Sequence, residues 1–118
     1  MKLLTFESSA KAASTALLSD GALLAEYTQN SGQTHSRTLM EMAKDMLGNC
    51  GLTPQDVDAV AVAAGPGSFT GVRIGMACAK GFPWGRQLPL YGVSTLEAMT
   101  RGAAYADGLY CACMDARK

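Results

Sequence analysis

Runs of apolar side chains separated by turn residues predict the strands of this chain. Ser19-Asp20-Gly21, a tight-turn sequence, separates the second run from the third, so the first three runs predict an antiparallel meander. The fourth run, AVAVAAGP, consists of small apolar residues, which is typical of a strand buried on both faces. The predicted strands are residues 2–7, 14–18, 22–29, 59–66, 87–94 and 108–118.

Helical patterns fill the intervals after the meander. The expected N-caps are Thr34 or Ser36 for the first helix, Ser68 for the second and Ser94 for the third. Pro83 ends the second helix, because proline clashes with the preceding turn. Strands that alternate with helices predict an α/β fold, a mixed sheet with helices on its faces. The predicted helices are residues 36–52, 68–81 and 94–108.

The first helix has an unusually wide apolar stripe. At about 100° per residue, the stripe covers an arc of roughly 160°, which is wider than contact with one sheet requires. One explanation is a helix that lies between the sheet and a second helix. The other is a surface that meets a partner protein through adaptable methionines. The stripe consists of Leu39, Met40, Met42, Ala43, Met46, Leu47 and Cys50.

Gly65-Pro66-Gly67-Ser68 connects the buried strand to the second helix. A glycine loop at a helix N-terminus can bind phosphate through free backbone N–H groups. Here Pro66 lacks that donor, and the P-loop spacing with its lysine is absent. The interpretation of Ser68 as a helix N-cap is therefore favoured over a phosphate site.

Three small residues follow in one row of the second helix. Gly71, Gly75 and Ala79 are spaced by four, so they lie on one side and allow another backbone to approach closely. The approaching element could be the first helix, the sheet or a partner. Close approach would explain why glycine, which costs about 1 kcal/mol relative to alanine in a helix, is present.

Catalytic and metal-binding patterns are weak. The nucleophile-elbow pattern is missing around Ser68, and His35 is the one histidine of the sequence, which supplies too few ligands for a metal site. Glu7 ends the first strand at the edge where α/β folds bind ligands, but it is a single carboxylate. Cys111 and Cys113 alternate on one face of the last predicted strand, and all four cysteines are interpreted as small buried thiols. The sequence predicts no cofactor.

Chain length and net charge exclude some classes of function. The 118 residues correspond to one domain, and ten basic residues balance ten acidic ones. A net charge of zero argues against direct nucleic-acid binding, so any contact with RNA is expected to be indirect. No signal-peptide core or membrane-length apolar run is found, and the chain is expected to be cytoplasmic with no membrane role.

Five segments together resemble one family along essentially the whole chain. They are LLTFESS, HSRTLMEMAKDML, VAAGPGSFTGVRIGMACAKG, LPLYGVSTLEAM and MDAR. The family is TsaB, also called YeaZ, of the glycoprotease family, and GPGSFTGVR, which includes Arg73, is the most specific motif. The resemblance implies a ribonuclease-H-like domain of the actin-like ATPase (ASKHA) superfamily.

The resemblance also implies a function. TsaB proteins are non-catalytic subunits that support TsaD, together with the ATPase TsaE, in threonylcarbamoyladenosine modification of tRNA beside the anticodon. TsaD carries a metal-binding H-x-x-x-H after the strand that corresponds to LPLYGVS, where this chain has Val93-Ser94-Thr95-Leu96-Glu97. The alternatives are an ATP-dependent phosphotransferase or peptidase of the same superfamily, and a plain homodimeric scaffold.

Family members pair with TsaD, or with themselves, through their first two helices. Carried over, this places the interface on residues 35–50 and 68–81. Residues 1–107 are expected to form the N-terminal domain, and 108–118 the first strand of a truncated or missing second domain. The expected partner-binding residues are Leu39, Met42, Met46, Gly71, Ile74 and Gly75.

Overall fold

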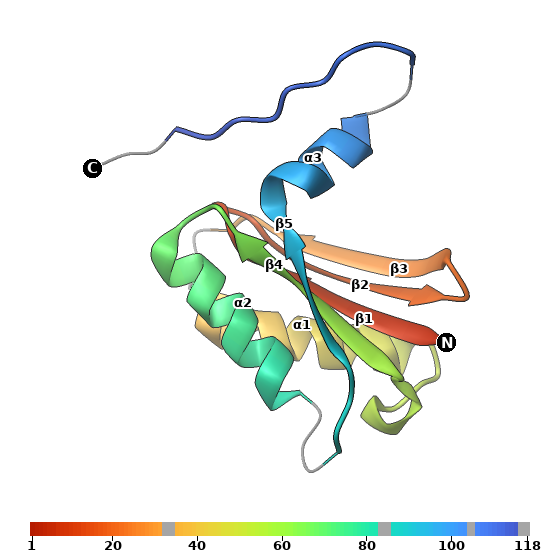
Figure 1. The fold of residues 1–118 in the computed structure, drawn as a ribbon. Coiled ribbons are helices and arrows are strands. Elements are labelled where there is room, and N and C mark those ends of the chain that lie inside the picture. The colour runs from red at the N-terminus through yellow and green to blue at the C-terminus, as the bar shows by residue number, and fades with distance from the viewer. Residues whose placement is uncertain (32–34, 83–85, 104–105, 116–118) are drawn as a thin grey trace.

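The computed structural model describes residues 1–31, 35–82, 86–103 and 106–115, and only the backbone of residues 35–37 (Figure 1). The expected N-cap Thr34 and the helix-ending Pro83 lie outside these ranges. Among the described helices, none is long and apolar enough to cross a membrane.

In the described part of the chain, five strands form one mixed sheet in the order β3-β2-β1-β4-β5. The first three pair antiparallel as the predicted meander, while β4 pairs parallel with β1 and β5 pairs parallel with β4. The mixed α/β sheet predicted from the sequence is therefore confirmed. The strands are β1 (Lys2–Glu7), β2 (Ala13–Ser19), β3 (Ala22–Gln29), β4 (Ala59–Gly65) and β5 (Leu90–Ser94).

The register assigns each strand residue to one of two faces. Leu4 lies beside Leu17 on one side and Val60 on the other, and all three side chains are buried in the core. We call this side of the sheet the inner face. Leu3 and Thr5 alternate with the buried residues of β1 and lie on the opposite side, which we call the outer face.

Helices α1 (His35–Asn49) and α2 (Phe69–Gly81) cover the inner face and contact each other. Figure 1 shows both on the same side of the sheet. The wide stripe of α1 is used inside the molecule, since it faces β2, β3 and α2. Its fully buried members are Leu39, Ala43, Met46 and Leu47.

Helix α2 ends at Gly81 as the sequence predicts, whereas α1 ends at Asn49, before the predicted end at residue 52. After α1, Gly51 has a φ of +71°, and the N–H of Leu52 donates to the carbonyl of Leu47 at 2.8 Å. After α2, Phe82 is buried, with its ring centroid 6.3 Å from that of Phe6 in β1. This aromatic contact attaches the end of α2 to the core.

A short 3₁₀ helix, Pro54–Asp56, precedes β4 and is capped by Thr53. The Asp56 carboxylate accepts the backbone N–H of Thr53 at 2.8 Å, and this hydrogen bond lowers the pKa of Asp56. The turn fixes the entry of the chain into β4.

Helix α3 (Thr95–Ala103) follows β5 directly. The Ser94 hydroxyl accepts the N–H of Glu97 at 3.4 Å, which agrees with the predicted cap. The strand predicted over 108–118 is not formed in the described residues 106–115. A strand requires a hydrogen-bonded neighbour, and the described chain pairs none with this segment.

The prediction of four buried thiols is wrong for the same segment. Cys111 and Cys113 are exposed, while Cys50 and Cys78 are half-buried. Burial also raises the pKa of the Cys78 thiol. Alternating apolar residues are buried only when a strand packs on a core, and residues 106–115 do not.

Thiol alkylation is therefore expected in two phases. Cys111 and Cys113 should react at least about tenfold faster than Cys78, because their side chains are exposed, whereas burial shields the Cys78 thiol and raises its pKa. Iodoacetamide labelling followed by mass spectrometry measures the rate at each site. A Cys111→Ser/Cys113→Ser variant should lack the fast phase, and four equal rates would contradict the assignment.

Candidate functional site

The glycine-rich turn joins the carboxyl end of β4 to α2 beside the end of β1. The backbone N–H of Ser68 donates to the Ser9 carbonyl at 2.7 Å. The Ser68 hydroxyl accepts the N–H of Gly71 at 3.2 Å, so the predicted N-cap is confirmed. Gly65 has a φ of +109°, a conformation that other residues rarely adopt.

The glycines of α2 pack against the two serines that follow β1. A Cβ atom on Gly71 would lie 2.1 Å from the Ser8 carbonyl oxygen, and one on Gly75 would lie 2.7 Å from the Ser8 hydroxyl. The Ser8 hydroxyl donates to the Gly71 carbonyl at 2.7 Å. A Cβ on Gly67 would lie 2.6 Å from the Ser9 carbonyl. The element that approaches the small-residue row is therefore the end of β1.

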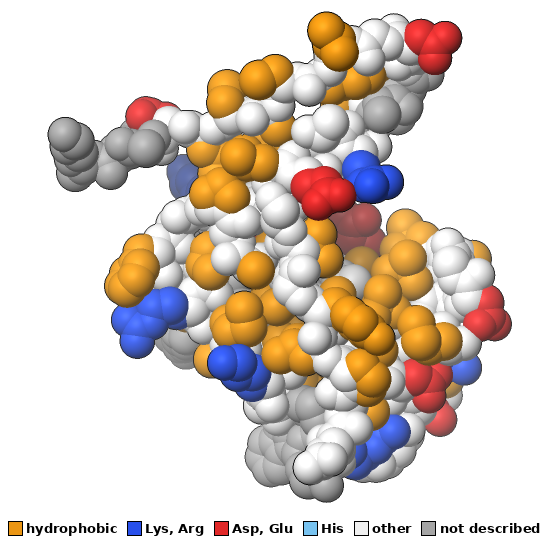
Figure 2. Space-filling model, in the orientation of Figure 1, with side chains coloured by type: hydrophobic (Ala, Val, Ile, Leu, Met, Phe, Trp, Pro, Cys, Tyr) orange, Lys and Arg blue, Asp and Glu red, His pale blue; other side chains and the backbone are white. Residues whose placement is uncertain are grey.

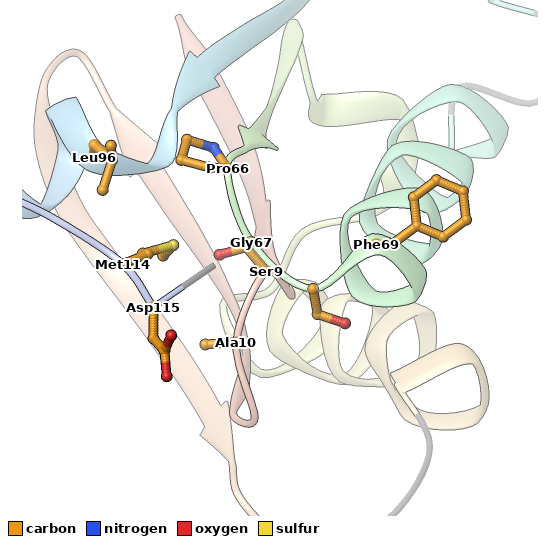
Figure 3. Close-up of a pocket in the computed structure, with 9 residues that line it drawn as sticks. Ser9, Ala10, Pro66, Gly67, Phe69, Leu96, Met114 and Asp115 are labelled. Atoms are coloured by element: carbon orange, nitrogen blue, oxygen red, sulfur yellow. The ribbon is translucent and has the colours of Figure 1, made fainter. Parts of the chain in front are cut away.

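An open pocket of about 700 Å³ lies beside this turn (Figure 3). Figure 3 shows Pro66, Leu96 and Met114 around it, while the Phe69 ring turns away on the other side of α2. The volume is in the range of small-molecule sites. Its described lining is Ser9, Ala10, Pro66, Gly67, Ser68, Phe69, Leu96, Met114 and Asp115.

The chemistry of this lining does not suit a phosphate. Asp115 is the charged residue in the described lining, and a carboxylate repels an anion. Pro66 has no N–H, and the N–H of Ser68 is already donated to Ser9. The hydroxyl and N–H of Ser9 both donate to the Glu7 carboxylate. The turn therefore serves to pack α2 against the end of β1 in this chain.

Glu7 and His35, which the sequence analysis considered as catalytic candidates, are not brought together with other catalytic groups in the described residues. The Glu7 carboxylate accepts two hydrogen bonds from Ser9, its near neighbour in sequence. His35 is the first residue of α1. Across the described residues, no group of three or more His, Cys, Asp or Glu side chains could hold a metal ion.

The predicted partner-binding residues fall into two layers. Leu39 and Met46 are fully buried, and Gly71 and Gly75 are buried in α2 next to Ser8. Met42 and Ile74 are half-buried and reach the surface of α1 and α2. The four buried residues pack inside the molecule and do not form part of its surface.

The sequence analysis missed Phe69, which lies at the start of α2 and is 76% exposed. The Arg73 guanidinium lies 5.2 Å from the centroid of its ring. Helical spacing could have indicated this position, since residues 69 and 73 lie about 200° from Gly71, opposite the small-residue row. We call the accessible side chains of α1 and α2, which include Met42, Phe69, Arg73 and Ile74, the helical surface.

The close approach of α2 to Ser8 predicts opposite effects for two Gly→Ala substitutions. Gly71→Ala should destabilise the protein by roughly 2 kcal/mol or more, because the new methyl group overlaps backbone atoms. Gly48→Ala in α1 should stabilise it by about 0.5–1 kcal/mol, because nothing lies within 4 Å of the added Cβ. Urea unfolding of both variants measures the difference, and equal effects would contradict this packing.

Comparison with known proteins assigns this chain to a family. A family model described as TsaD, tRNA N6-adenosine threonylcarbamoyltransferase, matches residues 22–118. The chain is 36% identical to the Bacillus subtilis protein named tRNA threonylcarbamoyladenosine biosynthesis protein TsaB, over 100% of this chain and 52% of that protein. The Escherichia coli protein of the same name is 39% identical, over 99% of this chain and 51% of that protein.

A solved structure agrees with these matches. YeaZ from Pseudomonas aeruginosa superposes with a TM-score of 0.78 at 36% identity, covering 88% of this chain and 48% of that one. The chain thus spans about half the length of the relatives it matches. Its α/β fold is the ribonuclease-H-like fold of the actin-like ATPase superfamily, as expected from the sequence. The chain therefore belongs to the family that the TsaD model describes, as a homologue of the proteins named TsaB or YeaZ.

Proposed function

We propose that this chain is a non-catalytic subunit in the biosynthesis of threonylcarbamoyladenosine in tRNA, and that it binds and supports a TsaD-type transferase. The observation that carries this proposal is the similarity of the whole chain to proteins named TsaB. The matched range covers the GPGSFTGVR motif, whose local role here is packing.

Two observations favour a supporting role over catalysis. The sequence contains one histidine, so the paired histidines of a TsaD-type metal site are missing after β5. The described lining of the pocket includes a carboxylate and no lysine or arginine to bind a phosphate. These features also weigh against the ATP-dependent phosphotransferase alternative.

The helical surface is the proposed binding site for TsaD. Phe69 and Arg73 belong to residue types that are enriched at interfaces, and the guanidinium lies over the exposed ring. Met42 and Ile74 add apolar area to the same two helices. The buried members of the predicted set keep the helices in place. They are Leu39, Met46, Gly71 and Gly75.

The remaining parts of the proposal follow from this role. TsaE would be reached through TsaD, and tRNA would be contacted indirectly, because the chain has no net charge. The subunit would act in the cytoplasm. We retain the proposed boundary between residues 1–107, an N-terminal domain, and 108–118, the start of a second one. A homodimer through the same helices is the competing outcome.

Binding to TsaD should depend on Ile74 and Met42. Ile74→Glu and Met42→Glu should each weaken binding by at least about tenfold, because a carboxylate would be desolvated in an apolar contact. Isothermal titration with the TsaD encoded by the same genome measures the affinity, and thermal melting checks that each variant folds.

The matched control is Leu23→Glu, a substitution on the outer face of β3, on the opposite side of the sheet from both helices, at a side chain that is 58% exposed. This variant should bind TsaD normally. Unchanged affinity in both helical variants, or equal loss in the control, would refute the proposed interface. Light scattering without TsaD would reveal a homodimer.

Nucleotide binding separates this proposal from the phosphotransferase alternative. Calorimetry with ATP and Mg²⁺ should show no micromolar binding by this chain alone, since no described pocket residue supplies a cation for the phosphates. Micromolar affinity for ATP that is lost in a Ser9→Glu variant, which adds a carboxylate to the pocket, would favour the phosphotransferase alternative instead.

A further inference from the structure

The segment that follows α3, residues 106–115, turns back and lies against that helix. Gly108 has a φ of +151°, a conformation that favours glycine, so the chain can turn at this position. The Tyr110 hydroxyl donates to the Ala106 carbonyl and accepts the N–H of Ala106 at 3.2 Å, which closes the turn. Side chains of α3 and of the segment then line one small cavity of about 170 Å³.

Sulfur-bearing side chains gather at this cavity. Met99 of α3 and Cys111 of the segment both line it, so a thioether and a thiol lie near each other. Cys113 follows two residues later in an extended stretch (Figure 1), and side chains at positions i and i+2 of an extended chain point to the same side. Figure 2 shows hydrophobic side chains, the class in which it includes methionine and cysteine, along α3 and this segment.

All three sulfur groups are open to solvent. Cys111 and Cys113 are exposed free thiols, and Met99 is 46% exposed. A disulfide between the two cysteines is disfavoured by their spacing. Positions i and i+2 of an extended chain lie about 6.6 Å apart, which is at the upper limit for the Cα atoms of a disulfide. The two thiols are therefore available to a ligand from solution.

The chemistry of this set selects one kind of ligand. Thiolate and thioether sulfur atoms are soft ligands, which suit Cu(I) and do not suit hard cations such as Mg²⁺ or Ca²⁺. A structural zinc site almost always has four ligands from cysteine, histidine and carboxylate side chains. The described residues offer no group of even three such side chains. Cu(I) forms stable complexes with two or three sulfur ligands, so the sulfur set is sufficient for this ion.

We propose that Cys111, Cys113 and Met99 form a binding site for Cu(I), in which the two thiolates are the main ligands and the thioether completes the set. Each thiol loses its proton when it binds the ion, so one Cu(I) displaces two protons. The bound ion links the segment to α3 through Met99. None of the three residues belongs to the helical surface, so the site is independent of the proposed TsaD contact.

Anaerobic titration of the reduced protein with Cu(I), in competition with the chromophoric chelator bicinchoninate, measures the stoichiometry and the affinity. We expect one Cu(I) per chain. Cys111→Ser and Cys113→Ser should each weaken binding by at least about a hundredfold, because each removes one of the two thiolates. Raising the pH from 6 to 7 should strengthen binding about a hundredfold, since two thiol protons are released for each bound ion.

Met99→Leu tests the thioether and should weaken binding by about threefold or more, since leucine has a similar volume but no ligand atom. Its matched control is Met114→Leu. Met114 follows Cys113 directly, but it lines the separate pocket beside the glycine turn and should not affect the affinity. Equal weakening by the two methionine variants would contradict the assignment of Met99.

The half-buried thiols supply the second control. Cys50→Ser/Cys78→Ser should bind Cu(I) as the parent chain does, because neither residue lines the cavity. Bound Cu(I) should also protect Cys111 and Cys113 from iodoacetamide. Undiminished binding by a Cys111→Ser/Cys113→Ser variant, or loss of binding in Cys50→Ser/Cys78→Ser, would overturn the proposal. Neither measurement involves TsaD, so the proposed function is tested separately.

Discussion

The close contact between α2 and the two serines after β1 determines how the parts of this molecule fit together. The Ser8 hydroxyl donates to the Gly71 carbonyl, and the Ser9 carbonyl accepts the N–H of Ser68, so two hydrogen bonds attach the start of α2 to the end of β1. A side chain on Gly71 would overlap the Ser8 carbonyl oxygen. The contact thereby fixes α2 on the inner face, and α1 then packs between α2 and the meander.

Local patterns predicted much of this arrangement because their causes are local. Ser68 caps α2 through its own first turn, and the meander follows from a turn at Asp20 and Gly21, which have φ values of 50° and 83°. The partner of the small-residue row could not be predicted, because spacing defines a row but not what approaches it. The last predicted strand failed because alternation at Cys111 and Cys113 does not supply a neighbouring strand.

The two faces of the sheet differ in how completely they are used. On the inner face, Leu4, Phe6, Val60 and Val62 are covered by helices, and their exposure is at most 2%. On the outer face, Tyr91 and Val93 remain open although they belong to a paired strand. Burial of one face supplies the main apolar stabilisation of the domain, and the other face is left available for association. Parallel strands such as β4 and β5 are usually covered on both faces, so an open outer face is the exception that requires an explanation.

The pocket beside the glycine turn shows why position in a fold does not define chemistry. It lies at the carboxyl ends of β1 and β4 and next to the N-terminus of α2, where many α/β proteins bind phosphates. Two of the groups that could bind an anion are already used, since the Ser68 N–H is donated to Ser9 and the Ser9 hydroxyl to Glu7. Converting the turn into a phosphate site would break the contacts that hold α2 on the sheet. In this chain the turn is used for packing, which is why its place in the fold does not by itself indicate phosphate chemistry.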